Sequence, residues 1–217
     1  MRNAAGETTD AAVDSRTAID PPPDLAAEAA RLLDRPGLVI ITGGPGCGRS
    51  RLLRRLGHSF RGPVFTGGGL AMLQSVPAFA LPRAVRAHLP THDTALLVEA
   101  VRSRVRNGLL LIDDLQWADS TTLAALAPLA AHCRIAATLR TPHRLPDDAV
   151  TALREAATGW LTVPALTAAE AAALARSVAP GLTTAEIAAV VRHAGGVPGS
   201  PGRSRKEVTA MALACWP

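Results

Sequence analysis

The sequence predicts an α/β fold in which a mostly parallel five-stranded sheet is covered by helices on both faces. Three observations indicate this class. Short apolar segments alternate with helical patterns along most of the 217 residues. These segments are continuously apolar, which is typical of parallel strands buried on both faces. Glycine, acidic or basic residues follow three of them, at the edge where such sheets bind ligands.

The first half of the chain contains a leader, two helices and two strands. Residues 1–23 are small and polar and end in three prolines, so we expect a disordered leader. From Asp24 apolar residues recur at helical spacing until Pro36-Gly37. Strands are predicted at 38–42 and 64–66, with a helix near 50–56 between them.

The second half continues the alternation of strands and helices, and it becomes rich in alanine after Thr167. Residues 69–106 are mostly helical with proline breaks, and a helix is expected at 121–131. Further strands are predicted at 109–112, 135–139 and 160–163, which completes a domain at 24–165. From Thr167 two alanine-rich helices, 168–178 and 184–194, predict a small helical lid over 166–200. An irregular tail is expected at 201–217.

Composition excludes several classes of protein. No apolar run approaches the ~20 residues that span a membrane, and no apolar segment marks a secretory signal. The three cysteines are too far apart for a zinc site or a disulfide framework, so we expect a cytoplasmic protein. The net charge of +5 comes from scattered arginines, and Lys206 is the only lysine. Dispersed, solvated arginines are the favoured interpretation, although direct nucleic-acid binding remains a third functional possibility.

A glycine-rich run carries the main chemical signal. It lies between the first strand and its helix, and it matches the phosphate-binding loop (P-loop) G-x-x-x-x-G-K-[ST]. Glycines let successive N–H groups curl around an anion, and the helix N-terminus supplies more N–H groups. An ordinary glycine turn is the alternative. The predicted nucleotide-binding residues are Gly43, Gly44, Pro45, Gly46, Cys47, Gly48, Arg49, Ser50 and Arg51, and the Ser50 hydroxyl is also a predicted Mg²⁺ ligand.

One position departs from the loop pattern, because Arg49 stands where the motif has lysine. Arginine keeps the charge, but its planar fork differs from the compact ammonium that reaches the β- and γ-phosphates. We therefore expect weakened phosphate binding and slow or absent hydrolysis.

A second signal is the apolar strand that ends in Asp113-Asp114, the Walker B pattern. Asp113 is predicted to hold Mg²⁺, and Asp114 to orient or deprotonate the attacking water. A solvated Asp-Asp turn is the alternative. The spacing from Ser50 suits neighbouring strands. Arg140, after the fourth strand, is predicted to contact the γ-phosphate, with a plain surface arginine as the alternative.

The residues after Asp113 resemble a known family. Asp113-Asp114-Leu115-Gln116-Trp117-Ala118-Asp119-Ser120-Thr121-Thr122-Leu123 is similar to the extended Walker B of the large ATP-binding regulators of the LuxR type. These belong to the STAND branch of P-loop ATPases, related to AAA+ domains. Arg140 matches the family's sensor position. Gly196-Val197-Pro198 resembles its G-x-P turn, which implies that Pro198 approaches the adenine. The resemblance covers about residues 25–200.

The resemblance implies a P-loop NTPase three-layer sandwich that binds ATP or ADP with Mg²⁺ and acts as a slowly hydrolysing switch in transcription regulation. It also implies a homo-oligomer or a regulatory protein as partner. The family's winged-helix, repeat and DNA-binding regions have no counterpart here, so a truncated module without a DNA-binding domain is expected. The alternative is a catalytically degenerate module that only binds nucleotide or protein. Arg49 favours the alternative, whereas Ser50, Asp113 and Asp114 favour the switch.

Overall fold

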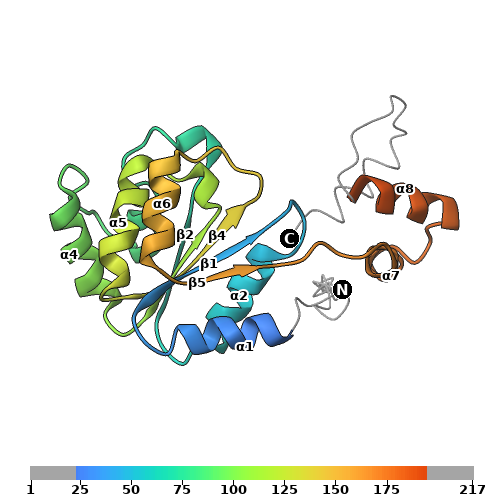
Figure 1. Cartoon of the computed structure of the whole chain (residues 1–217), viewed down its shortest axis with the longest axis horizontal. Coiled ribbons are helices and arrows are strands. Elements are labelled where there is room, and N and C mark those ends of the chain that lie inside the picture. Colours follow the sequence, from blue (N-terminus) through green and yellow to red (C-terminus); the bar gives the residue numbers. More distant parts are fainter. Residues whose placement is uncertain (1–22, 195–217) are drawn as a thin grey trace, which may run out of the picture. The chain divides into compact units, whose positions relative to one another are not determined.

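A computed structural model describes residues 23–194 of the chain (Figure 1). The described part divides into two compact units, one ending at Leu166 and the other beginning at Thr167. The strands of the first unit are β1 (Gly37–Gly43), β2 (Val64–Gly68), β3 (Leu109–Asp113), β4 (Arg134–Arg140) and β5 (Ala157–Thr162). Its helices are α1 (Pro23–Leu32), α2 (Arg49–Ser59), α3 (Ala80–Val85), α4 (Thr94–Val105), α5 (Ser120–Ala130) and α6 (Asp147–Ala156), with short 3-10 turns η2 (Ala71–Leu73) and η3 (Leu115–Trp117).

The five strands form one sheet in the order β2-β3-β4-β1-β5. Every strand pair is parallel, so the predicted parallel sheet is confirmed. The expectation that the strands preceding Ser50 and Asp113 are neighbours is wrong, because β4 lies between β1 and β3. The carboxyl ends of these three strands nevertheless share one edge, with Gly43 of β1 aligned with Arg140 of β4.

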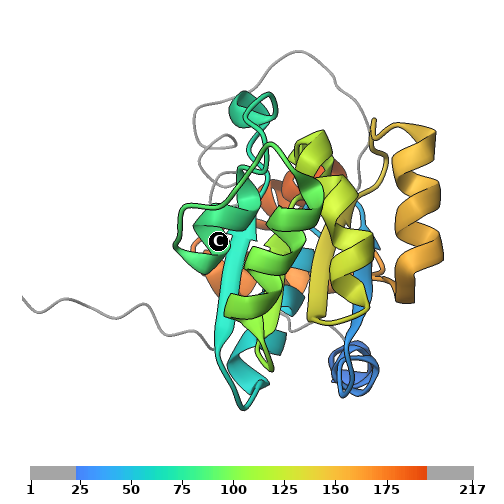
Figure 2. The same cartoon turned by 90° about the vertical axis from the view of Figure 1, so that its left-hand side faces the viewer.

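Helices cover both faces of the sheet, which makes the predicted three-layer sandwich. Leu38 and Ile40 of β1 pack in one apolar cluster with buried residues of α3, α4, α5 and α6. Val39 and Ile41, which point the other way, pack in a second cluster with α1 and α2. Figures 1 and 2 show these two sets of helices on opposite sides of the strands. Each fully buried Leu or Ile contributes about 1.5–3 kcal/mol to folding, so the alternation along β1 fixes both layers.

Two segments differ from the sequence prediction. Residues 69–106 hold only η2, α3 and α4, because their prolines break the helical pattern, and Asp93 begins α4 by accepting from the N–H groups of Ala95 and Leu96. Helix α6 was not predicted at all. Its acidic first turn is a typical start signal, but it buries only Leu153 fully, so its apolar stripe is short.

The second unit contains α7 (Ala168–Val178) and α8 (Thr184–Ala194), which match the two predicted alanine-rich helices. Thr167 and Glu170 form a capping box at the start of α7. The two hydrogen bonds from Thr167 to the Glu170 carboxylate lower the pKa of that group. A small apolar cluster that includes Ala175 and Ile187 joins the helices. The function of a lid remains a prediction.

Three predicted features lie outside the described residues: most of the leader, the tail and Pro198. Within residues 23–194, no helix has both the length and the apolar character that a membrane crossing requires.

Candidate functional site

The glycine-rich loop joins β1 to α2 at the carboxyl edge of the sheet. Gly46 and Gly48 have φ angles of 72° and 97°, a left-handed region that favours glycine. The Leu52 N–H donates to the Gly48 carbonyl over 2.9 Å as α2 begins. The N–H groups of residues 49–51 therefore precede the helical ladder, and the first turn of α2 faces the loop with its positive dipole end.

Three glycines of the loop have no neighbouring atoms on the side where a side chain would project. A Cβ atom added at Gly44, Gly46 or Gly48 would meet no heavy atom within 4 Å, so the backbone borders free volume there. Cys47 differs, because its side chain is buried in the cluster beneath α1 and α2. Its Sγ would lie 2.5 Å from a Cβ added at Gly43. The thiol thus faces the core, and Cys47 can meet a ligand through its main chain alone.

Arg49 turns back onto the loop that precedes it. Its Nη1 donates to the carbonyl oxygens of Gly43 and Gly44, the latter over 2.9 Å. The side chain is only 9% exposed, and its Nε is buried with no hydrogen-bond partner among the described residues. The positive charge therefore stays at the loop, but its Nη1 is already engaged by main-chain oxygens. An oxyanion at the loop would have to share this guanidinium with them.

The first acid of the pair at the end of β3 is fixed by the neighbouring strand. Asp113 Oδ1 accepts from the Thr138 hydroxyl of β4 and from the Asp114 N–H, the latter over 3.0 Å. The Thr138 oxygen also accepts from the Asp114 N–H over 2.8 Å. Thr138 is fully buried. Sequence reasoning missed this residue, although a lone hydroxyl inside the apolar segment 135–139 is a usable signal.

The second acid is held by a different partner. Asp114 has a left-handed backbone, with φ 55° and ψ 56°, and its Oδ1 accepts from Gln116 Nε2 over 2.7 Å. The other end of that amide, Oε1, accepts from the Arg140 N–H over 3.0 Å. The sequence prediction did not include Gln116 in the site.

Asp119 has a structural place in the extended motif. Its buried carboxylate caps α5 through the N–H and hydroxyl of Thr122. It also accepts from the N–H groups of Ala78 and Phe79, over 2.7 Å and 3.1 Å. This acid therefore joins the segment before α3 to the start of α5. All four of its hydrogen bonds are made within the protein, which indicates a structural role.

The predicted site residues follow strands whose carboxyl ends lie at the same edge of the sheet, except for Pro198. Arg140 is exposed at the end of β4 and aligned with Gly43, and the Thr141 N–H donates to the Gly43 carbonyl over 2.9 Å. β1 and β3 are two strand spacings apart, which is about 10 Å. Pro198 lies outside the described residues.

The structure offers few cation ligands at this edge. Among the described residues, no group of three or more His, Cys, Asp and Glu side chains could hold a metal ion. Asp113 and Ser50 remain the candidates. A Mg²⁺ site does not require such a group, because Mg²⁺ keeps several waters and is usually bound by one or two carboxylates together with phosphates.

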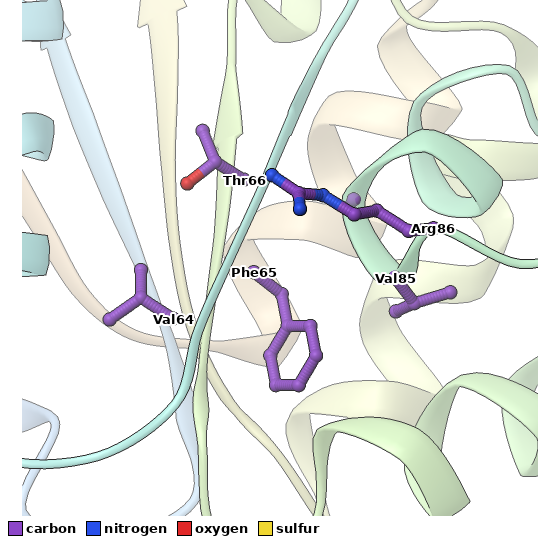
Figure 3. Close-up of a pocket in the computed structure, with 6 residues that line it drawn as sticks. Val64, Phe65, Thr66, Val85 and Arg86 are labelled. Carbon is purple, nitrogen blue, oxygen red and sulfur yellow. The ribbon is translucent and has the colours of Figure 1, made fainter.

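A separate cavity of about 290 Å³ lies at the far end of the sheet. It is lined by Val64, Phe65 and Thr66 of the edge strand β2 and by the end of α3 with Arg86, as Figure 3 shows. Two strands, β3 and β4, lie between β2 and β1, so this cavity is separate from the glycine-rich loop that follows β1.

Comparisons with known proteins place the fold. No protein-family model matches the sequence, and no curated protein matches it either. Among solved structures, a chain of the HORMA:CdnC:Trip13 complex of E. coli MS115-1 is similar over 89% of this chain and 81% of its own, with 17% identity and a TM-score of 0.51.

Two other solved structures match less well. A chain from a study of DNA unwinding by two coordinating Pif1 helicases matches with 12% identity and a TM-score of 0.43, over 69% of this chain and 45% of its own. A STAND protein with a tetratricopeptide repeat sensor from Pyrococcus horikoshii matches with 18% identity and a TM-score of 0.40, over 82% and 29%. The comparisons therefore support the fold alone: this chain shares a parallel α/β architecture with the matched chain of the E. coli complex.

Proposed function

We propose that the chain binds ATP or ADP with Mg²⁺ at the carboxyl edge of its sheet, and that it acts as a slowly hydrolysing or non-hydrolysing switch. The observation that carries the proposal is the placement of two motifs on one edge. The glycine loop follows β1, and the Asp113-Asp114 pair ends β3, with only β4 between them. An edge of this kind is where open α/β sheets bind ligands.

Each residue has a separate task in this proposal. The main-chain N–H groups of loop residues 43–51, among which Pro45 has none, bind the phosphates, and the dipole of α2 adds to their attraction. Asp113 and the Ser50 hydroxyl hold Mg²⁺, which neutralises charge on the phosphates when it is bound. Asp114 orients or deprotonates the attacking water, and Arg140 contacts the terminal phosphate.

The Arg49 contacts favour a second candidate, a module that binds nucleotide weakly and no longer turns it over. Nη1 is engaged by the carbonyl oxygens of Gly43 and Gly44, so a phosphate competes with them for the guanidinium. Lysine would present a compact ammonium with three rotatable donors instead. We therefore expect the natural chain to bind ATP more weakly than a lysine variant.

The resemblance of residues 113–123 to LuxR-type STAND regulators supports a regulatory setting for this switch. In that setting the partner is a second copy of the chain or another regulatory protein. We also propose a cytoplasmic location, which the wide spacing and odd number of the cysteines in the sequence favour.

Calorimetric titration with ATP and with ADP, each with Mg²⁺, tests the proposal. We expect measurable binding by the natural chain and about tenfold tighter binding by Arg49→Lys, the value of one charge-assisted hydrogen bond. Arg54→Lys, on an exposed position of the same helix, is the matched control and keeps the natural affinity. Absence of heat for both the natural chain and Arg49→Lys would refute nucleotide binding. Asp114→Asn then separates the two candidates, because it abolishes only genuine turnover.

A further inference from the structure

Gln116 makes two side-chain hydrogen bonds that the proposed function does not use. It lies in η3, directly after the acid pair, and its side chain is buried. Nε2 donates to Asp114 Oδ1 over 2.7 Å, and Oε1 accepts from the Arg140 N–H over 3.0 Å. One buried amide therefore joins the end of β3 to the end of β4.

The chemistry of the partners fixes the orientation of this amide. A carboxylate only accepts hydrogen bonds, and a main-chain N–H only donates. Turning the amide by 180° would place Oε1 against the Asp114 carboxylate and the NH₂ group against the Arg140 N–H, so both contacts would become repulsive. Gln116 therefore cannot satisfy one partner while it is turned away from the other.

The bridge reaches both sides of the proposed nucleotide site. Among the described residues, Oδ2 of Asp114 accepts no hydrogen bond, so Gln116 anchors one carboxylate oxygen and leaves the other to water. On the other side, the residue after Arg140 donates its N–H to the Gly43 carbonyl over 2.9 Å. The end of β4 is thus bonded both to the loop and, through Gln116, to Asp114.

We propose that Gln116 is a positioning residue that couples Asp114 to the end of β4: it holds Oδ1 so that Oδ2 is the oxygen available to the attacking water, and it passes a displacement of Arg140 to this carboxylate. The catalytic part of this inference rests on the proposed function, whereas the coupling itself exists without nucleotide. The two parts therefore have separate tests.

Amide hydrogen exchange at Arg140, measured by NMR on the full chain without nucleotide, tests the coupling. Gln116→Leu removes the acceptor and is expected to speed exchange about fivefold, the effect of one lost hydrogen bond. Asp114→Ala is expected to speed it two- to threefold, and to have no further effect when combined with Gln116→Leu. Additive effects, or no effect of Asp114→Ala, would overturn the coupling.

Gln116→Glu supplies the second arm and guards against a misfolded leucine variant. It keeps the acceptor for the Arg140 N–H but sets a carboxylate against Asp114, so we expect a displaced Asp114 together with exchange at Arg140 that is no faster than in Asp114→Ala and slower than in Gln116→Leu. In ATP turnover it should lower kcat about fivefold and change KM less than twofold, because only the placement of Asp114 is affected. Equal changes in kcat and KM would overturn the positioning role.

Gln74→Ala is the matched control, because Gln74 Nε2 donates to the main-chain oxygen of Gln116 over 3.4 Å, so its loss removes a contact of the same residue while the side-chain amide keeps both of its partners. It should leave both readouts unchanged, and a change of the same size as in Gln116→Glu would overturn the assignment to the amide. A natural chain that binds no nucleotide would refute the proposed function, while the exchange experiment would still decide the coupling.

Discussion

The Thr138 hydroxyl donates to Asp113 Oδ1 from the adjacent strand, while its oxygen accepts from the Asp114 N–H. One buried hydroxyl thus contacts both acids at the end of β3. Because Thr138 is fully buried within β4, it cannot turn to solvent for replacement partners. The position of the acid pair is therefore set partly by a strand that does not contain it.

Replacing Thr138 by valine is expected to destabilise the chain. The variant keeps the shape but leaves Asp113 and the Asp114 N–H with fewer partners in a half-buried place, which costs about 1–3 kcal/mol. Urea unfolding measures the change, and Thr138→Ser should recover most of it. Thr66→Val, on the exposed side of β2, is the control and should change the free energy of unfolding by less than about 0.5 kcal/mol. A valine variant as stable as the natural chain would show that the hydroxyl contacts contribute nothing.

Asp119→Ala is expected to be more harmful than the same change at Asp93. Both residues begin a helix and accept from N–H groups of its first turn, but Asp93 is exposed, whereas Asp119 is only 4% exposed and also holds Ala78 and Phe79. Loss of an exposed cap costs about 0.5–2 kcal/mol. Stranding two further N–H groups raises the expected cost at Asp119 to at least about 3 kcal/mol. Thermal or urea unfolding that gives equal losses for the two variants would contradict this.

The sequence could predict the sheet and both motifs, because continuous apolar segments and glycine spacing are local signals. It could not predict that β4 lies between β1 and β3, since strand order depends on long-range pairing. For the same reason Thr138 and Gln116 escaped notice. Each has a partner more than twenty residues away in the chain, without which its role is incomplete. The sequence also could not predict that the Arg49 side chain donates to the loop before it, because the motif gives the residue type at that position and not its rotamer.

Two loop glycines allow the cost of backbone strain to be measured apart from the cost of steric clashes. Gly48 has a φ of 97°, whereas Gly44 has no such angle, and a Cβ at either position meets no neighbour within 4 Å. Gly48→Ala should therefore cost about 1–2 kcal/mol from the left-handed backbone alone. Gly44→Ala should leave the free energy of unfolding within about 0.5 kcal/mol of the natural value. Equal stability of the two variants would show that the loop relaxes without cost.

The capping box at the start of α7 predicts a local pH dependence. Hydrogen bonds from Thr167 lower the pKa of Glu170 below its ordinary value of 4.5. A lowered pKa in the folded state means that the ionised carboxylate stabilises the helix start above pH 4.5, and that this contribution is lost as the pH falls through the lowered pKa. Amide exchange at Thr167, whose N–H donates to Glu170 over 2.7 Å, reports it after correction for the intrinsic exchange rate. Protection of the Thr167 N–H from exchange should fall across this range in the natural chain.

Glu170→Gln should remove the pH dependence, because its amide oxygen still accepts but does not titrate. Glu155→Gln, in the last turn of α6, should leave the Thr167 profile as it is in the natural chain. A profile that stays flat in the natural chain, or one that still falls in Glu170→Gln, would contradict this account of the cap.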